Sequence, residues 1–245
     1  MFKSGFVNII GNPNVGKSTL MNAMVGEKLS IVTAKAQTTR HRIMGIVNGE
    51  DYQVVFSDTP GILKPNYRLQ QDMVNFVDAA IGDADVILYV TDTVEKPDKN
   101  SEYVDKLSKL TCPVIIVINK IDISDQSKVL ELMNYWKEKV SAAEIIPASA
   151  QEKFGLENIF RTILEKLPVC PPWYDKDAFT DKNLRFFAEE IIREKILLNY
   201  KEEIPYCCQA QVETFKEGAD RYDISAVIYV MRDSQKGSRT AWHYC

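Results

Sequence analysis

The sequence has few cysteines, and they form no recognisable pattern. The five cysteines are scattered, odd in number and without a CxxC pair. Disulfide frameworks and structural zinc sites need paired or regularly spaced cysteines. We therefore expect reduced thiols, as in a cytosolic protein, and exclude a disulfide scaffold or a cysteine-based zinc site.

Long apolar runs and an excess of basic residues are also lacking. No apolar run approaches membrane-spanning length, and the apolar stretch in the N-terminal "MFKSGFVNIIG" is too short for a signal peptide. The net charge of -4 and the isoelectric point near 5.4 lack the bulk basic signature of a nucleic-acid-binding protein. A local basic patch is still compatible with these values. The chain has 245 residues, of which 45% are hydrophobic, so a cytosolic globular protein is expected.

Short apolar runs alternate with amphipathic stretches over residues 1–167. This alternation is typical of an α/β fold with a doubly wound, mostly parallel sheet, here of six strands. The dipeptide Asn48-Gly49 predicts a hairpin between the second and third strands, and therefore one antiparallel edge strand. The predicted strands are Phe6–Ile10, Ile43–Val47, Tyr52–Ser57, Val86–Thr91, Val114–Asn119 and Ile145–Ala148, and the predicted helices lie near Lys17–Val25, Gln70–Ile81, Ser101–Leu110, Lys128–Val140 and Leu156–Leu167.

The remainder of the chain divides into a linker and a smaller α+β unit. Residues 168–183 are rich in proline and charge, which predicts a linker after the first domain at residues 1–167. Residues 184–245 contain one helical pattern and two alternating strand patterns around a turn with Gly218. One helix and two strands form a poor independent core. The helical pattern places these apolar residues on one face: Leu184, Phe187, Ala188, Ile191, Ile192 and Leu198.

The stretch "GNPNVGKS", Gly11–Ser18, matches the phosphate-loop pattern GxxxxGK[ST] between a predicted strand and a predicted helix. Gly11 and Gly16 let successive backbone N–H groups turn toward phosphate oxygens, and the helix N-terminus favours the same anion. Lys17 is expected to reach the β- and γ-phosphates, and the Ser18 hydroxyl to bind Mg²⁺. This strand–loop–helix context makes a chance glycine-rich turn a poor alternative. The nucleotide-binding residues of this segment are Gly11, Asn12, Pro13, Asn14, Val15, Gly16, Lys17, Ser18 and Thr19.

The stretch "NKID", Asn119–Asp122, indicates guanine as the base. Guanine presents adjacent N1–H and amino donors, which the carboxylate of Asp122 accepts, whereas adenine would leave that carboxylate unpaired. Asn119 is expected to bind the base at N7, and the aliphatic stem of Lys120 to cover its face. An N–H group of Ala148–Ala150 can donate to the guanine O6. The base-binding residues are Asn119, Lys120, Ile121, Asp122, Ala148, Ser149 and Ala150.

The stretch "DTPG", Asp58–Gly61, follows the third predicted strand and is interpreted as the element that senses the γ-phosphate. Asp58 is expected to hold Mg²⁺ through a water molecule, and the Gly61 N–H to meet the γ-phosphate. A proline turn that ends a strand is the alternative, and the order of the motifs favours the phosphate interpretation. The segment contributes Asp58, Thr59, Pro60, Gly61 and Ile62 to the nucleotide site.

The long loop before the second strand contains "KAQTTRHR", Lys35–Arg42. A threonine hydroxyl from this loop would complete the Mg²⁺ shell in the presence of a γ-phosphate, and we favour Thr39 over Thr38. The basic side chains fit a solvated loop face equally well, and no metal role for His41 is needed. The expected metal ligands are Ser18, Thr39 and Asp58, and the expected catalytic residues are Lys17, Thr39 and Gly61.

Many GTPases place a glutamine directly after the DxxG motif to orient the attacking water. Ile62 occupies that position here and has no hydrogen-bonding group. We therefore expect slow intrinsic hydrolysis, or a backbone group or a cation in place of the glutamine. No covalent intermediate is expected, because positioning and charge neutralisation carry this reaction.

Together these elements resemble the Era family of bacterial GTPases. The resemblance rests on "GNPNVGKSTLMNAMVGEKLSIVTAKAQTTRHRIMGI", "FSDTPGI", "VINKID" and "PASA", and continues to "YDISAVIYVMRDSQKG". It implies a P-loop GTPase that uses GTP, GDP and Mg²⁺, and that couples hydrolysis to 16S rRNA processing and assembly of the small (30S) ribosomal subunit. It also implies rRNA binding through a C-terminal type II KH domain and peripheral association with the inner membrane. Asn14 is similar to a residue that helps bind K⁺ in related GTPases, which gives the hypothesis of a K⁺ site.

The C-terminal part departs from the family pattern. The family's KH domain carries a GxxG loop that clamps the nucleic-acid backbone, and no GxxG occurs after residue 183. We expect a partial, truncated or rearranged KH-like domain at 184–245, with RNA binding in doubt. Two alternatives stay open: a GTP-dependent scaffold with negligible hydrolysis, and a related GTPase with another RNA target, in tRNA modification or large-subunit assembly.

Overall fold

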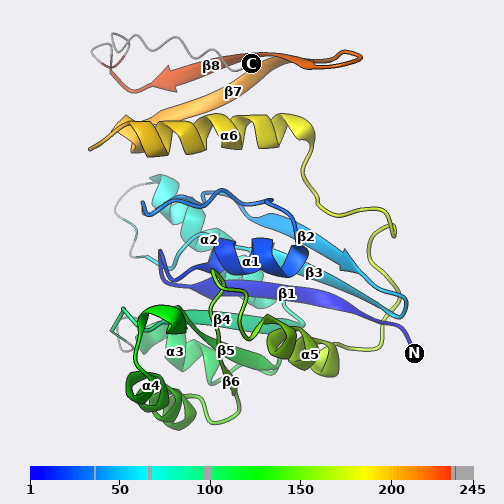
Figure 1. The fold of residues 1–245 in the computed structure, drawn as a ribbon, viewed down its shortest axis with the longest axis vertical. Helices are drawn as coiled ribbons and strands as arrows, with labels where there is room; N and C mark the ends of the chain where they lie inside the picture. The colour runs from blue at the N-terminus through cyan, green and yellow to red at the C-terminus, as the bar shows by residue number, and fades with distance from the viewer. Residues whose placement is uncertain are drawn as a thin grey trace. The chain divides into compact units, whose positions relative to one another are not determined.

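The structure is a computed structural model. Two compact units are present, residues 1–181 and residues 182–245, and each is described by itself (Figure 1). Among the described residues, no helix combines the length and the apolar character needed to span a bilayer. The residues that the structure describes are 1–35, 37–63, 65, 68–96, 101–202, 204–232 and 235.

The first unit is built on a six-stranded sheet with the order β2-β3-β1-β4-β5-β6. Every neighbouring pair is parallel except β2 and β3, which form an antiparallel hairpin closed by a hydrogen bond from the Gly49 N–H to the Tyr52 carbonyl. This arrangement confirms the predicted fold class. The strands are β1 (Lys3–Gly11), β2 (Ile43–Asn48), β3 (Tyr52–Asp58), β4 (Val86–Asp92), β5 (Val114–Asn119) and β6 (Glu144–Pro147).

The central strands are buried on both faces, because helices cover the sheet from both sides. All residues of β4 and β5 are buried. On one face, α2, α3 and α4 form an apolar cluster with the sheet around Tyr89 and Trp136, and α1 contacts α5. Continuous apolar runs are the sequence pattern that such doubly covered strands require. The helices are α1 (Lys17–Val25), α2 (Arg68–Gly82), α3 (Ser101–Leu107), α4 (Gln126–Lys139) and α5 (Leu156–Lys166), with a short 3₁₀ helix, η1 (Ile121–Ile123).

Residues 168–181, which their composition predicts to be a linker, lie along the first unit and form part of it. The Ile46 N–H of β2 donates to the Phe179 carbonyl at 2.9 Å. The Gln53 side chain accepts the backbone N–H groups of Trp173 and Tyr174 at 2.7 and 2.9 Å. The segment therefore follows the β2–β3 edge of the sheet instead of running free of it.

The second unit contains α6 (Leu184–Asn199), the 3₁₀ helix η2 (Ile204–Tyr206) and an antiparallel hairpin of β7 (Cys208–Glu217) and β8 (Tyr222–Val230). Buried and exposed residues alternate at the start of β7, as predicted. This helix and hairpin form a small α+β unit, as predicted. The final stretch "SRTAWHYC" lies outside the described residues.

The predicted apolar face of α6 is wrong in part. Leu184, Ile191 and Leu198 are all more than half exposed. The buried side of the helix instead includes Glu190 and Arg193, which form an ion pair at 2.5 Å with both side chains only 6% exposed. Pairing offsets part of the cost that burial of either charge alone would impose, so these two charged residues share the buried side of the helix, which the periodicity assigned to apolar residues.

Candidate functional site

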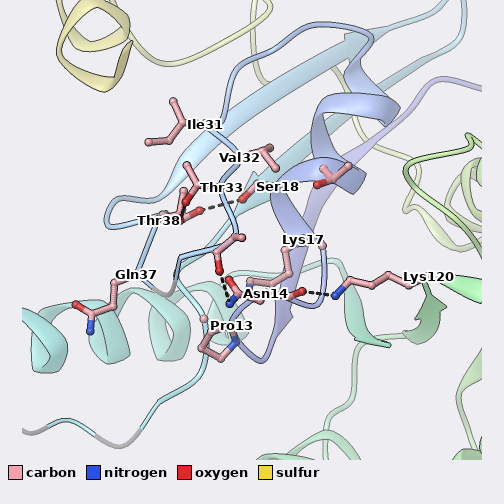
Figure 2. A pocket seen from close by; sticks show the side chains of 15 residues that line it. Pro13, Asn14, Lys17, Ser18, Ile31, Val32, Thr33, Gln37, Thr38 and Lys120 are labelled. Carbon is pink, nitrogen blue, oxygen red and sulfur yellow. Dashed lines mark hydrogen bonds between the residues drawn. The ribbon is translucent and has the colours of Figure 1, made fainter. Parts of the chain in front are cut away.

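The loops that carry the sequence motifs follow the carboxyl ends of β1, β3, β5 and β6. In an open parallel sheet these ends meet at one edge, where ligands bind. A cavity of about 340 Å³ lies there, with the β1–α1 loop on one side and the segment around Ile31–Thr33 facing it (Figure 2). Its lining residues are Pro13, Asn14, Gly16, Lys17, Ser18, Thr19, Ile31, Val32, Thr33, Ala34, Gln37, Thr38, Thr39, Gly61 and Lys120.

Two glycines fix the path of the phosphate loop. Gly16 has a φ of 96°, and a Cβ there would lie 2.2 Å from Nδ2 of Asn119. A Cβ on Gly11 would lie 2.1 Å from the Val90 carbonyl oxygen. Any larger residue would push the loop away from its neighbours. Gly16 also begins α1 without a side-chain cap, so the first N–H groups of this helix are available to an anion.

Lys17 is folded back into the loop. It is 6% exposed, and its Nζ donates to the Asn12 carbonyl at 2.8 Å. Burial lowers the pKa of Lys17 to about 8, while the negative charges of Asp58 and Glu95 act in the opposite direction. The loop therefore holds a buried cation in the place where phosphate oxygens are expected.

Three oxygen-bearing side chains from separate segments meet beside Lys17. The Ser18 hydroxyl donates to Oδ2 of Asp58 at 2.6 Å and lies 2.9 Å from the Thr39 hydroxyl. Asp58 is fully buried, and its Oδ1 has no hydrogen-bond partner among the described residues. Burial raises the pKa of Asp58, and the Ser18 hydrogen bond and the Lys17 charge oppose that rise. A buried carboxylate oxygen without a partner, next to two hydroxyls, is a donor set that fits Mg²⁺.

The two neighbouring threonines differ in their contacts. Thr39 lies with Ser18 and Asp58, and its hydroxyl is 3.4 Å from the Asp58 carboxylate. Thr38 instead donates to the Lys35 carbonyl at 2.6 Å and lies 2.7 Å from the Thr33 hydroxyl. Thr38 therefore ties its own loop together, and Thr39 is the one that faces the oxygen cluster.

The segment after β3 lies against the phosphate loop. A Cβ on Gly61 would lie 2.7 Å from the backbone nitrogen of Pro13, so only glycine allows this approach. Ile62 is 4% exposed and packs into the core, while its N–H donates to the Gly11 carbonyl at 3.0 Å. The residue that replaces the expected glutamine thus points into the protein. Thr59 and Pro60 are buried, and the Thr59 hydroxyl donates to the Ile9 carbonyl at 2.7 Å.

Asn119 joins the phosphate loop to the segment after β6. It is 2% exposed; its Nδ2 donates to the Val15 carbonyl at 2.8 Å, and its Oδ1 accepts the Ala150 N–H at 2.9 Å. The N–H groups of Ala148 and Ser149 are also paired within the protein. A base oxygen at this segment would therefore share the Ala150 N–H with Asn119.

Lys120 and Asp122 are placed differently. Lys120 has a φ of 60°, and its Nζ donates to the Asn14 carbonyl and to the Asp92 carboxylate, both at 2.6 Å. Asp122 lies in η1 and is exposed, and its carboxylate forms no hydrogen bond or ion pair with a described residue. It is an acceptor available to a ligand. Ile121 connects the two and donates its N–H to the Ala148 carbonyl at 3.3 Å.

Sequence reasoning missed the polar residues at the end of β4. Asp92 binds Lys120, the Thr93 hydroxyl donates to the Lys120 carbonyl at 3.1 Å, and Glu95 accepts from the Asn12 side chain at 2.6 Å. These residues belong to no motif. Their position directly after a central buried strand was the available signal, since that end of the sheet carries the site.

Comparison with known proteins places this site in a family. A family model described as "50S ribosome-binding GTPase" matches residues 6–120. The chain is 43% identical over 239 residues to the GTPase Era of Geobacter metallireducens, which covers 96% of this chain and 80% of the relative. It is 40% identical over 239 residues to the GTPase Era of Clostridium perfringens, covering 97% of this chain and 81% of the relative.

Solved structures give the same result. A crystal structure of Era in complex with MgGDPNP and nucleotides 1506–1542 of 16S ribosomal RNA has a TM-score of 0.90 at 38% identity, covering 96% of this chain and 82% of that one. A variant of Aquifex aeolicus Era bound to GDP and AlF₄⁻ has a TM-score of 0.90 at 38% identity, covering 96% and 81%. The similarity extends over both units of the chain.

Proposed function

The chain belongs to the Era family of GTPases, and we propose that it is a GTP-hydrolysing switch that acts on 16S rRNA during assembly of the small ribosomal subunit. The observation that carries the proposal is a connection between two segments of the site. Asn119 holds the phosphate loop and the base-binding segment together at one cavity. Similarity over 96% of the chain, to a relative named as a GTPase, supports the hydrolytic activity. The family membership inferred from the motifs is thereby confirmed.

We infer a role for each part of the cavity. The N–H groups at the start of α1 and the Lys17 ammonium bind the phosphates, and Gly61 offers its N–H to the γ-phosphate. Asp122 accepts the two donors of guanine, with Lys120 held over the site by Asp92. Ser18, Thr39 and Asp58 hold Mg²⁺, which supplies charge neutralisation of the phosphates. The Mg²⁺-bound nucleotide in the Era–rRNA complex supports this assignment.

We propose that a K⁺ ion takes part in hydrolysis where a glutamine does so elsewhere. Ile62 is buried in the core, so its side chain does not orient water. Asn14 is exposed at the cavity, with its Nδ2 donating to the Ala34 carbonyl at 3.1 Å, and its oxygen supplies a cation ligand. Single-turnover GTP hydrolysis is expected to be faster in K⁺ than in Na⁺ at equal ionic strength, and Asn14→Ala to abolish the difference. Equal rates in both salts for the unaltered chain would contradict the K⁺ site.

We propose 16S rRNA as the partner because a structurally similar Era binds nucleotides 1506–1542 of that RNA. The experiment is binding of this chain to that RNA segment, against a shuffled sequence, with a non-hydrolysable GTP analogue or GDP. Preference for the native segment is expected in the presence of the analogue. Hydrolysis without any RNA preference would leave a GTPase with another target, and the family model's description makes 23S rRNA the second RNA to test.

We propose a cytoplasmic location with peripheral association at the inner membrane, and the resemblance to the family supports this proposal. Co-sedimentation of the chain with vesicles of anionic phospholipid tests the association. Recovery of the chain in the supernatant at low salt would contradict the proposed membrane association.

A further inference from the structure

The turn after β4 carries Glu95, whose carboxylate has no role in the proposed function. Oδ1 of Asp92 accepts the backbone N–H groups of Val94 and Glu95 at 2.9 and 2.8 Å, which fixes the turn. Oε1 of Glu95 accepts from the Thr91 hydroxyl at 2.7 Å, and Oε2 accepts from Nδ2 of Asn12 at 2.6 Å. The carboxylate is thus held between the end of a central strand and the phosphate loop.

Asn12 lies between two opposite charges. Glu95 binds its side chain, and the Lys17 ammonium binds its backbone carbonyl at 2.8 Å. Asn12 is 2% exposed, Lys17 is 6% exposed and Glu95 is half-buried, so water screens this arrangement only in part. A buried ammonium is costly unless an anion lies nearby. Glu95 supplies such a charge, in addition to Asp58.

A bound nucleotide changes this balance of charges. Its phosphates would join Asp58 and Glu95 as anions around the one ammonium of Lys17. Asp58 belongs to the oxygen cluster that fits Mg²⁺ and gains a cation together with the nucleotide. Glu95 is outside that cluster, so its charge repels the phosphates across the loop.

We propose that Glu95 is an internal counter-anion of the phosphate loop: it holds the loop when no nucleotide is bound, and it weakens binding in proportion to the phosphate charge of the nucleotide. This inference rests on the proposed function, because it requires the loop to bind guanine nucleotides. Its consequence is faster nucleotide release, and therefore easier exchange of GDP for GTP.

The variant Glu95→Gln separates the charge from the contacts. The amide oxygen of glutamine can still accept from Asn12, and its NH₂ group can donate to the Thr91 hydroxyl. Dissociation constants for GMP, GDP and a non-hydrolysable GTP analogue are measured by competition at fixed Mg²⁺ and ionic strength. We expect E95Q to bind the GTP analogue about fivefold more tightly, with a smaller increase in affinity for GDP and the smallest for GMP. The tighter binding is expected to arise from slower dissociation of the nucleotide.

The matched control is Glu131→Gln, which removes the same charge from an exposed position on α4 and is expected to leave all three constants unchanged. Glu95→Ala removes the charge together with both contacts and is expected to keep the same gradation with phosphate number. Circular dichroism of each nucleotide-free variant verifies its secondary structure.

The outcomes separate this inference from the proposed function. Equal changes for all three nucleotides would show that Glu95 only maintains the loop's shape, and would overturn the inference. Unchanged or weaker binding of the GTP analogue by E95Q would also overturn it. Failure of the unaltered chain to bind any of the three nucleotides would instead overturn the proposed function.

Discussion

The phosphate half and the base half of the cavity are prepared for a ligand in different ways. In the phosphate half, Lys17, Ser18 and Asp58 already have partners within the protein, which must be exchanged when phosphates and Mg²⁺ arrive. In the base half, the exposed carboxylate of Asp122 forms no hydrogen bond or ion pair with a described residue. The two halves meet at Asn119, which is bonded to both.

The two halves contribute differently to the affinity and to the selectivity of nucleotide binding. Exchange of existing hydrogen bonds yields only a modest net gain per bond, about 0.5–1.5 kcal/mol. A carboxylate that accepts two donors from one base and none from another discriminates much more strongly, because the wrong base leaves it unpaired. We expect substitutions in the base half to change which nucleotide binds, and those in the phosphate half to change how the γ-phosphate and Mg²⁺ are bound.

The largest effect is expected for Asp122→Asn. The amide keeps one acceptor and presents a donor to the guanine amino group, so GTP affinity falls by about a hundredfold to a thousandfold. Xanthine carries a carbonyl in place of that amino group, and the asparagine amide can donate to it. Competition between GTP and xanthosine triphosphate measures the change. A parallel loss for both nucleotides would mean that Asp122 does not contact the base.

The junction of the two halves is tested by Gly16→Ala. The residue has a φ of 96°, and a Cβ would lie 2.2 Å from Nδ2 of Asn119, so Asn119 must leave its bond to Val15. Strain of about 1–3 kcal/mol and the lost bond together predict about a hundredfold weaker nucleotide binding.

The matched control for this change is Gly26→Ala at the end of α1. Gly26 has a similar φ of 86°, but a Cβ there meets nothing within 4 Å. It therefore carries the backbone strain without the collision, and we expect it to lower the thermal stability while nucleotide affinity stays within about twofold. Equal losses of affinity in the two variants would show that Asn119 does not couple the halves.

The phosphate loop and "NKID" could be predicted because their chemistry is contained in short local segments. Contacts between distant segments could not be predicted. Asp92 and Glu95 are separated by many residues from Lys120 and Asn12, and only the parallel order of β1, β4 and β5 brings them together. A single sequence predicts the alternation of strands and helices. It does not predict which polar side chains from different strands contact one another at the edge of the sheet.

The second unit shows a different limit. The periodicity of α6 predicted an apolar face, yet Glu190 and Arg193 are buried as a pair and Ile191 is more than half exposed. A prediction from hydrophobic periodicity assumes that every charged residue lies on the solvent-exposed side of the helix. A pair three residues apart on one helix can neutralise itself, so it escapes that rule.

A smaller effect, confined to the phosphate half, is expected for Thr39→Ala. Loss of one hydroxyl from the oxygen cluster predicts about tenfold weaker binding of a GTP analogue at limiting Mg²⁺, with GDP binding within about twofold. Thr38→Ala is the matched control, because that hydroxyl binds Lys35 and Thr33 instead. Titration of Mg²⁺ with each nucleotide measures both. A larger loss of GTP-analogue affinity in the Thr38 variant would indicate that Thr38, and not Thr39, binds Mg²⁺.

The smallest effect is expected for Asp92→Asn. The amide can still accept the N–H groups of the turn through its oxygen, but Lys120 loses an ion pair in which the carboxylate is only 5% exposed. Lys120 then holds the Asn14 carbonyl less firmly, and we expect about threefold weaker binding of GMP, GDP and a GTP analogue alike. The control Asp78→Asn breaks the exposed pair with Lys106 and is expected to change nothing, since such pairs contribute little. A loss of affinity that grows with phosphate number would indicate that Asp92 affects nucleotide binding through its charge and not through its ion pair with Lys120.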